Sequence, residues 1–451
     1  MKWLKRVLTA LAVLLVVAVA LPFFISLNDY IPRIEKEVSA RLKEPVSIKS
    51  IKFASLPLLP HITVNGIAIG TSDDIRLGKV LVTPDLFSLL KSTTVIKSIE
   101  IDSLTLTRKA INMIPSWAKS DAAKSPQQSP QFRVESIRFT NALVNFGKAS
   151  FGPFDARISL DSEGEPEDAL ITTQDGKFKA LIKPDNSKYL VNASAKSWTL
   201  PVEPVLVFDE LVIKGVATLN DANLSEVSAK LYGGTAIGKM TISWQKELRL
   251  DGNLDVTQVE MQKIAPMLSS QTHVSGKLSA KPIFSASAAS ADQLMNALRL
   301  EMPFKVQNGA LHGVDIQKAA TNLIKQGTTS GETRFEQLSG HLIMEHGGYR
   351  FTQLEIVSGA LSADGNVNIS PKKELSGRIN AQVTAVGISA NVPLNVGGTV
   401  DAPLLYPTGG TMAGAAIGTV ILGPGFGTSV GAKVGGWAEG LFGKKKEKKP
   451  K

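Results

Sequence analysis

The sequence predicts a mainly β protein, in which an N-terminal transmembrane helix precedes an antiparallel β-sheet with a few short helices. Three observations support this. An uncharged stretch runs from Val7 to Leu27, and most of the chain after Val46 alternates apolar and polar residues. Such alternation gives a strand one apolar and one polar face. Turn residues divide the alternating runs at short intervals, as at Gly233-Gly234, Gly347-Gly348 and Asp364-Gly365.

The uncharged stretch is long enough to cross a bilayer as a helix that rises about 1.5 Å per residue. Lys2, Lys5 and Arg6 precede it, which places that end in the cytoplasm and the body outside it. Ala18-Val19-Ala20 also matches a signal-peptide cleavage site, so a cleaved signal peptide is the alternative. We expect a retained anchor because the apolar run continues beyond that site to Ile25. Both interpretations export the body.

Charge and cysteine content exclude several classes of protein. The chain has no cysteine, so it has no disulfides and no thiol chemistry. Of its net charge of +10, the three basic residues at the head supply three and the Lys444–Lys451 tail supplies five, which leaves +2 for the body. A body without a basic surface is not expected to bind nucleic acid. The terminal clusters are better suited to anionic lipid head groups.

Apolar residues recur three or four positions apart, as in a helix, in only a few segments. Ile31, Ile34, Val38 and Leu42 predict a helix that ends before Pro45, and we expect three more within 259–268, 290–298 and 315–326. A Ser-, Pro- and Gln-rich stretch predicts a linker. The expected organisation is an anchor at 1–27, a helix plus β unit at 28–115, a linker at 116–131, a central β region at 132–260, a C-terminal β domain at 261–407 and a Gly-rich apolar segment with a Lys-rich tail at 408–451.

The Gly-rich segment has no charge from Pro403 to Ala432, and its glycines recur four residues apart, as at Gly414 and Gly418. Small residues at this spacing allow apolar helices to approach closely in a membrane. We therefore expect a possible second membrane contact at 411–432, followed by Lys444, Lys445 and Lys446. A flexible glycine-rich tail is the alternative.

The clearest alternation covers residues 242–256. The large apolar side chains all fall at even positions: Ile242, Trp244, Leu248, Leu250, Leu254 and Val256. Polar residues hold most of the odd positions, so we expect this segment to be a strand with one dry and one wet face. The dry face could line an open groove or be buried against a second sheet in a β-sandwich. Alternation alone does not distinguish these two arrangements.

Three motifs partly match known catalytic, phosphate-binding or metal-binding patterns, but each lacks a residue that its chemistry requires. Gly427-Thr428-Ser429-Val430-Gly431 matches a nucleophile elbow, but every histidine lies upstream of it. The sequence from Gly233 to Met240 is close to a phosphate-binding loop, but Met240 stands where a magnesium-binding Ser or Thr is needed. His341 and His346 lack a carboxylate at ligand spacing. We therefore expect no enzyme activity, no cofactor and no metal.

Two stretches resemble the AsmA family of bacterial envelope proteins. The first joins the N-terminal anchor and short helix to Pro45-Val46-Ser47-Ile48, Leu86-Phe87-Ser88-Leu89-Leu90 and Ile96–Ile101. The second, more specific, runs from Phe304 to Ile316 and continues with Thr333–Gly340, Asp364-Gly365-Asn366-Val367, Val392-Pro393-Leu394 and Gly398–Pro403. The resemblance covers roughly 1–110 and 260–407. The Gly-rich tail departs from the usual family pattern.

This resemblance implies an elongated, curled β-sheet that forms a groove with an apolar concave face, anchored in the bacterial inner membrane with its body in the periplasm. It implies transport of phospholipid in cell-envelope and outer-membrane biogenesis, with the inner membrane, its phospholipids and other envelope proteins as partners. The even-numbered residues of 242–256 would then contact acyl chains. The alternative is a scaffold without transport activity that assists the assembly or targeting of outer-membrane proteins.

The retained anchor predicts the N-terminus of the mature protein. N-terminal sequencing of the protein isolated from membranes should begin at Met1 or Lys2, because the apolar run has no polar break at the cleavage site. A sequence beginning at Leu21 would instead identify a cleaved signal peptide.

Overall fold

The computed structural model is mainly β, and strands hold 72% of the residues that it describes. The described residues are 27–56, 59–72, 74–85, 87–88, 93–107, 109–110, 131–146, 149–200, 205–264, 272–289, 291–294, 296–322, 326–327, 331–359, 361–385 and 388–408. They form two compact units. The N-terminal unit comprises 1–205, 212–222 and 290–292, and the C-terminal unit comprises 206–211, 223–289 and 293–451. β11 (Val207–Ala217) and β12 (Asp221–Leu231) contribute residues to both.

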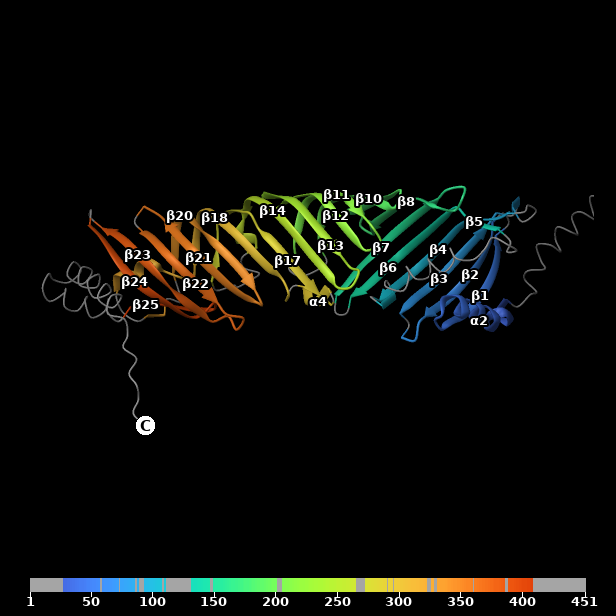
Figure 1. The fold of residues 1–451 in the computed structure, drawn as a ribbon, viewed down its shortest axis with the longest axis horizontal. Helices are drawn as coiled ribbons and strands as arrows, with labels where there is room; N and C mark the ends of the chain where they lie inside the picture. The colour runs from blue at the N-terminus through green and yellow to red at the C-terminus, as the bar shows by residue number, and fades with distance from the viewer. Residues whose placement is uncertain are drawn as a thin grey trace, which may run out of the picture. The chain divides into compact units, whose positions relative to one another are not determined.

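In the N-terminal unit, most strands that follow one another in the chain lie side by side (Figure 1). The exception is β5 and β6, which both pair with β4, one after the other along its length. These strands are β1 (Val46–Leu56), β2 (Leu59–Ile69), β3 (Ile75–Pro84), β4 (Thr93–Thr107), β5 (Gln131–Val134), β6 (Ser136–Phe146), β7 (Ala149–Leu160), β8 (Pro166–Thr173), β9 (Phe178–Asp185) and β10 (Lys188–Thr199).

The prediction of an antiparallel sheet is correct for most strand pairs of this unit, but not for β4. This strand pairs in parallel with both β5 and β6. A parallel neighbour needs a long crossover connection, because a tight hairpin reverses the chain. Most of the predicted linker at 116–131 belongs to this connection and lies outside the described residues, apart from Gln131, which begins β5.

A short helical segment packs on β1 and accepts hydrogen bonds from its backbone. It consists of a 3₁₀ turn, η1 (Leu27–Tyr30), and helix α2 (Ile31–Leu42), as predicted. Side-chain oxygens of Ser39, Glu35 and Asn28 accept the N–H groups of Val46, Ile48 and Ile51 at 3.0, 2.7 and 2.8 Å. An exposed strand edge is a template for pairing with another chain, and these side chains occupy its donors.

The C-terminal unit repeats the pattern of neighbouring antiparallel strands. Its strands are β13 (Gly234–Ser243), β14 (Leu248–Glu260), β15 (His273–Val274), β16 (Lys277–Ala280), β17 (Ile283–Ala288), β18 (Arg299–His312), β19 (Gln326–Gly327), β20 (Glu332–Glu345), β21 (Gly348–Val357), β22 (Leu361–Ile369), β23 (Leu375–Ala385), β24 (Ile388–Thr399) and β25 (Ala402–Pro407).

The helices in this part of the chain are shorter than predicted. Where 259–268 was expected to be helical, β14 extends to Glu260 and a single turn, η3 (Met261–Lys263), follows. The helix expected at 290–298 is α4 (Ala291–Leu294). The one expected at 315–326 is α5 (Ile316–Asn322), while Gln326 belongs to β19. Helix α5 packs against β20, β23, β24 and β25, and Ile316, Ala319 and Ala320 belong to the main buried cluster of the unit.

Two of the three quoted turn predictions are correct. Tyr232 and Gly233 both have positive φ between β12 and β13, and so do His346 and Gly347 between β20 and β21. The prediction at Asp364-Gly365 is wrong, because both residues lie inside β22. A Cβ at Gly365 would approach the carbonyl oxygen of Arg378 to 2.3 Å, so this glycine permits close contact with the neighbouring strand instead of a turn.

The predicted membrane segments cannot be placed in the fold. Both the anchor, except for Leu27, and the possible second contact at 411–432 lie outside the described residues, as do Lys2, Lys5, Arg6, Lys444, Lys445 and Lys446. Among the described helices, none has the length and apolar character needed to cross a bilayer.

The edge of β1 supplies a test of the fold. Replacing Glu35 by Ala leaves the Ile48 N–H without its acceptor, so the free energy of local opening should fall by about 1–2 kcal/mol. Hydrogen exchange of the β1 amides measures this as a faster rate. The control is Glu37→Ala, which removes only an exposed ion pair with Arg41 and should change exchange by less than ~0.5 kcal/mol. Equal effects of the two substitutions would show that Glu35 does not protect this edge.

Candidate functional site: apolar sheet faces

A row of apolar side chains crosses one face of the N-terminal unit. Its members stand directly opposite one another on neighbouring strands, and opposed residues point to the same face of a sheet. This N-terminal row consists of Ile62, Val82, Ile99, Ile137, Ile158, Ala169, Ile182 and Val191. Every member is half-buried. The inner faces of a closed sandwich would bury such large aliphatic side chains almost fully.

The predicted lipid-contacting residues of 242–256 lie on two strands instead of one. Chain reversal between β13 and β14 places Ile242 opposite Leu250. In the same pairing Gly238 stands opposite Leu254, and Ala236 opposite Val256. Ile242, Leu248, Leu250, Leu254 and Val256 therefore share one face, as predicted, and all five are half-buried. The expectation that they contact lipid is not tested by these positions alone.

Trp244 differs from the other five residues. It lies in the connection between β13 and β14, beyond the last opposed pair, Ser243 and Arg249. Its exposure is 37%, the highest of the six. The prediction of one continuous strand over 242–256 is therefore wrong at Trp244. The even spacing gives no sign of the turn, because even-numbered residues point to the same face on β13 and on β14.

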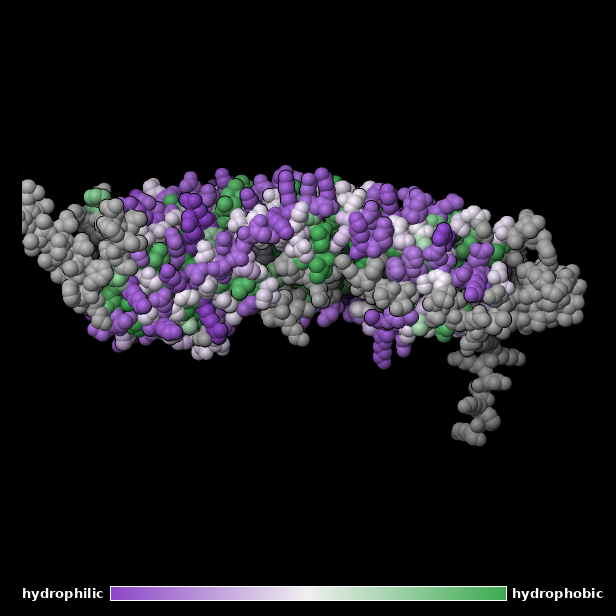
Figure 2. Space-filling view, turned by 180° about the vertical axis from the view of Figure 1, so that it is seen from behind, coloured by the Kyte–Doolittle hydropathy of each residue, from purple (hydrophilic) through white to green (hydrophobic). Residues whose placement is uncertain are grey.

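The opposite face of the β13–β14 hairpin is mainly polar, although Ile237, which stands opposite Asp255, is an exposed apolar residue on it. Arg249 and Asp251 form an ion pair with a nitrogen–oxygen distance of 2.8 Å, and the Asp251 carboxylate raises the pKa of Arg249. Thr241 stands opposite Asp251, and Lys239 opposite Asn253. Figure 2 shows one side of the molecule, on which hydrophilic side chains predominate and hydrophobic ones lie between them. Both faces thus follow the alternation of the sequence.

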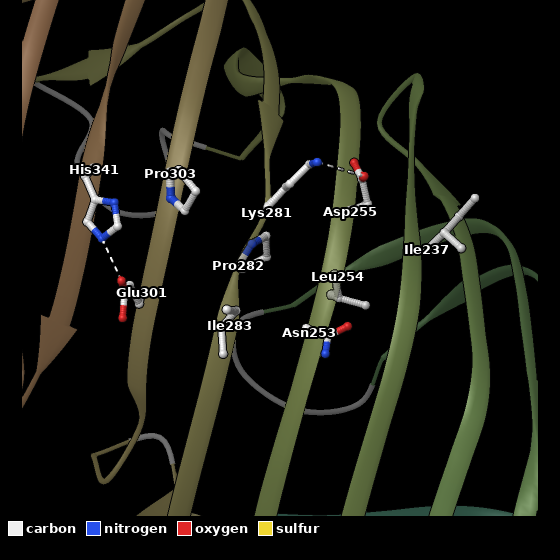
Figure 3. Close-up of a pocket in the computed structure, with 10 residues that line it drawn as sticks. All are labelled: Ile237, Asn253, Leu254, Asp255, Lys281, Pro282, Ile283, Glu301, Pro303 and His341. Carbon is white, nitrogen blue, oxygen red and sulfur yellow. Dashed lines mark ion pairs between the residues drawn. The ribbon is translucent and has the colours of Figure 1, made fainter.

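A shallow depression of about 490 Å³ lies where β13, β14, β17, β18 and β20 run side by side (Figure 3). Ile237 and Ile283 line it and are 53% and 62% exposed. Ion pairs border it: Glu301 with His341 at 3.2 Å and Lys281 with Asp255 at 3.9 Å. These side chains form salt bridges between neighbouring elements, and the depression presents no nucleophile beside a base.

A second polar cluster surrounds the end of β18. Ser275 Oγ lies 2.9 Å from His312 Nε2, and His312 Nδ1 lies 3.6 Å from Glu332. The serine oxygen also accepts the N–H of Ala310, which ties it to strand pairing. The His273 ring stacks on His312 with centroids 4.6 Å apart. Burial, and then the charge of His312, lowers the pKa of His273 below its ordinary value.

Nothing in the described part of the chain collects three or more His, Asp or Glu side chains in a geometry that could hold a metal ion. The region that resembles a phosphate-binding loop, Gly233 to Met240, forms the start of the β13 hairpin strand instead. What the described residues do present repeatedly is an apolar sheet face with half-buried side chains.

No protein-family model, curated protein or solved structure matches this chain. Membership of the AsmA family therefore stays a hypothesis that rests on the sequence resemblance.

The lowered pKa of His273 gives a pH prediction. A histidine whose pKa is lower in the folded state contributes stability that is present above the pKa of the unfolded chain, about 6.5, and is lost as the pH falls below it. Thermal unfolding of the full chain should therefore lose more stability between pH 7.5 and 5.5 in wild type than in His273→Gln. The control is His346→Gln in an exposed turn. Identical pH profiles for wild type and both variants would contradict the prediction.

Proposed function

We propose that this chain is an AsmA-like protein of the bacterial envelope that carries phospholipid by holding acyl chains against its apolar sheet faces. In this proposal residues 1–27 anchor it in the inner membrane, the body lies in the periplasm and its cargo serves outer-membrane biogenesis. The partners are membrane phospholipids and other envelope proteins. No catalysis, cofactor or nucleic acid is involved.

The observation that carries this proposal is the half-burial of the N-terminal row. Eight opposed positions on neighbouring strands hold apolar side chains, and none is fully buried. Soluble proteins seldom leave a large contiguous apolar surface without a binding role. Covering such a surface stabilises a complex by about 25 cal/mol per Å² of apolar area removed from water.

Acyl chains suit this surface chemically and geometrically. Each buried methylene contributes about 0.8 kcal/mol, so a chain of ordinary length gains enough to leave water without any directional contact. Neighbouring strands are spaced by about 4.8 Å, so the eight positions extend for roughly 34 Å. An acyl chain spans half of a hydrocarbon core of ~30 Å, or about 15 Å. The polar opposite face remains in water, which a carrier in the periplasm requires.

Leu250 and Asp251 are adjacent residues on opposite faces of β14, and they provide a matched test. Leu250→Asp places a charge among acyl-contacting positions and should lower phospholipid bound to the full chain at least about ten-fold, since burying an unpaired charge costs several kcal/mol. Asp251→Leu removes only an exposed ion pair and should leave lipid binding near wild type. Bound phospholipid is quantified by mass spectrometry after extraction.

The result also separates carriage from the scaffold alternative. Absence of phospholipid from folded wild-type protein, with equal loss of folding in both variants, would contradict lipid carriage and favour a closed scaffold. Lipid in wild type and in Asp251→Leu, but not in Leu250→Asp, supports the proposal.

A further inference from the structure

The apolar face of the C-terminal unit contains two rows that differ in burial. The half-buried row consists of Met240, Gly252, Phe284, Leu300, Met344, Tyr349, Ile369 and Leu375, each opposite the next on a neighbouring strand. The buried row consists of Val259, Leu278, Val306, Leu338, Ile356, Ala363, Ala381 and Val392, which are opposed in the same way.

Both rows lie on the same face. Leu300 and Val306 are six residues apart on β18, and Ala363 and Ile369 are six apart on β22. An even spacing along a regular strand returns the side chain to the same face. At about 3.3 Å per residue, the two rows are roughly 20 Å apart along the strands.

Helix α5 covers the buried row where that row crosses β20, β23 and β24. Seven members of the buried row are 8% exposed or less. Six of these seven, all except Val259, share one buried cluster with Val314, Ile316, Ala319 and Ala320, and Leu278 packs against that cluster. The helix is held there by Thr333, whose hydroxyl accepts the Ile316 N–H and donates to the Val314 carbonyl, both at 2.9 Å. All eight members of the half-buried row remain between buried and exposed.

The half-buried row lies near the strand ends, where partial exposure is common. The unusual feature of the row is its composition of large apolar side chains. Met, Phe, Leu, Tyr and Ile occupy these ends on the apolar face. Most neighbouring positions on the other face are polar, among them the exposed Glu301, Arg350, Asn368 and Ser376, although Ile283 and Ile343 are apolar there. A strand end that only met water would not need large apolar side chains on one face. The apolar character therefore extends about 20 Å beyond the reach of α5.

We propose that acyl chains bind the C-terminal unit along the half-buried row, because α5 fills the same sheet face at the buried row. This inference rests on the proposed function. The row crosses eight strands, or about 34 Å, and so accommodates a chain of about 15 Å lying across the strands. Helix α5 thus determines which part of the sheet face binds lipid. It restricts an acyl chain to the part of the face away from Ala381 and Val392.

The test is photochemical mapping on the full chain. Wild-type protein is incubated with vesicles of phosphatidylethanolamine and phosphatidylglycerol that contain a phospholipid with a diazirine in its acyl chain, then irradiated and analysed by peptide mass spectrometry. Adducts should form at Met344, Tyr349 and Ile369 and be absent from Ala381 and Val392. Adducts concentrated at the latter two residues would overturn the inference.

Two substitutions on β22 provide matched variants. Ile369→Asp places a charge in the half-buried row and should reduce labelling of Met344 and Tyr349 at least about ten-fold, which corresponds to about 1.4 kcal/mol. Asn368→Asp adds the same charge on the opposite face and should leave labelling unchanged. Full labelling of Met344 and Tyr349 in a folded Ile369→Asp protein would contradict the inference.

Failure of the inference can be told apart from failure of the proposed function. Adducts at Ile137 and Ile158 of the N-terminal row, with none on the half-buried row, would reject this site and retain lipid carriage. Absence of adducts from both units would reject both. The wild-type map decides this even when a variant does not fold.

Discussion

The register between neighbouring strands, antiparallel at nearly every step and parallel between β4 and β6, is the constraint on which the rest of the structure depends. Because opposed residues share a face, an apolar position on one strand aligns with an apolar position on the next, and the alternation of single strands adds up to rows that cross each unit. A slip of one residue would send the apolar side chains of a strand to the polar face. Apolar side chains in these rows are stabilised when they are removed from water, but other parts of the described structure bury only some of them.

The main contacts of the helix differ between the two units. In the N-terminal unit the η1–α2 segment packs on β1 and accepts three of its N–H groups with side-chain oxygens, so it protects strand backbone. Leu42 at the end of α2 also packs against the buried cluster that contains Ile69 and Ile75. In the C-terminal unit α5 covers sheet face: Leu394 is fully buried and Ala381 has no exposed surface in the cluster around it. Where neither helix reaches, Ile158 and Ile182 in one unit and Met344 and Ile369 in the other stay half-buried. The proposal of lipid carriage accounts for these uncovered positions with a single ligand class.

The sequence predicts the faces of strands better than their connections. Alternation identified the shared face of Ile242, Leu250 and Val256 correctly, because the chain reverses between β13 and β14 without changing side-chain parity. For the same reason it missed the turn at Trp244. Gly365 was mistaken for a turn residue, since a glycine that allows a close strand approach looks identical in sequence to one that allows positive φ. The parallel pairing of β4 with β6 has no periodic signal, because it depends on a crossover.

The sequence also does not predict which members of a row are buried and which are half-buried. Leu338 and Met344 are both apolar residues at even positions of β20, yet Leu338 is 8% exposed in the cluster that includes α5, whereas Met344 is half-buried outside it. The helix itself was predicted from its spacing, but the surface that it covers depends on strands distant in the chain. The candidate site is therefore a property of tertiary packing, although each of its residues is recognisable by its apolar alternation.

Accessibility of the N-terminal row tests the central claim most directly. Because the chain has no cysteine, a single spin label can be attached at Ile158→Cys on the apolar face or at Arg157→Cys on the polar face of β7. Electron paramagnetic resonance with a water-soluble nickel relaxant should find both labels accessible without lipid, and phospholipid should then protect only the label at position 158. A label at position 158 that is inaccessible before lipid is added, and unchanged by it, would identify a closed apolar core and contradict this account.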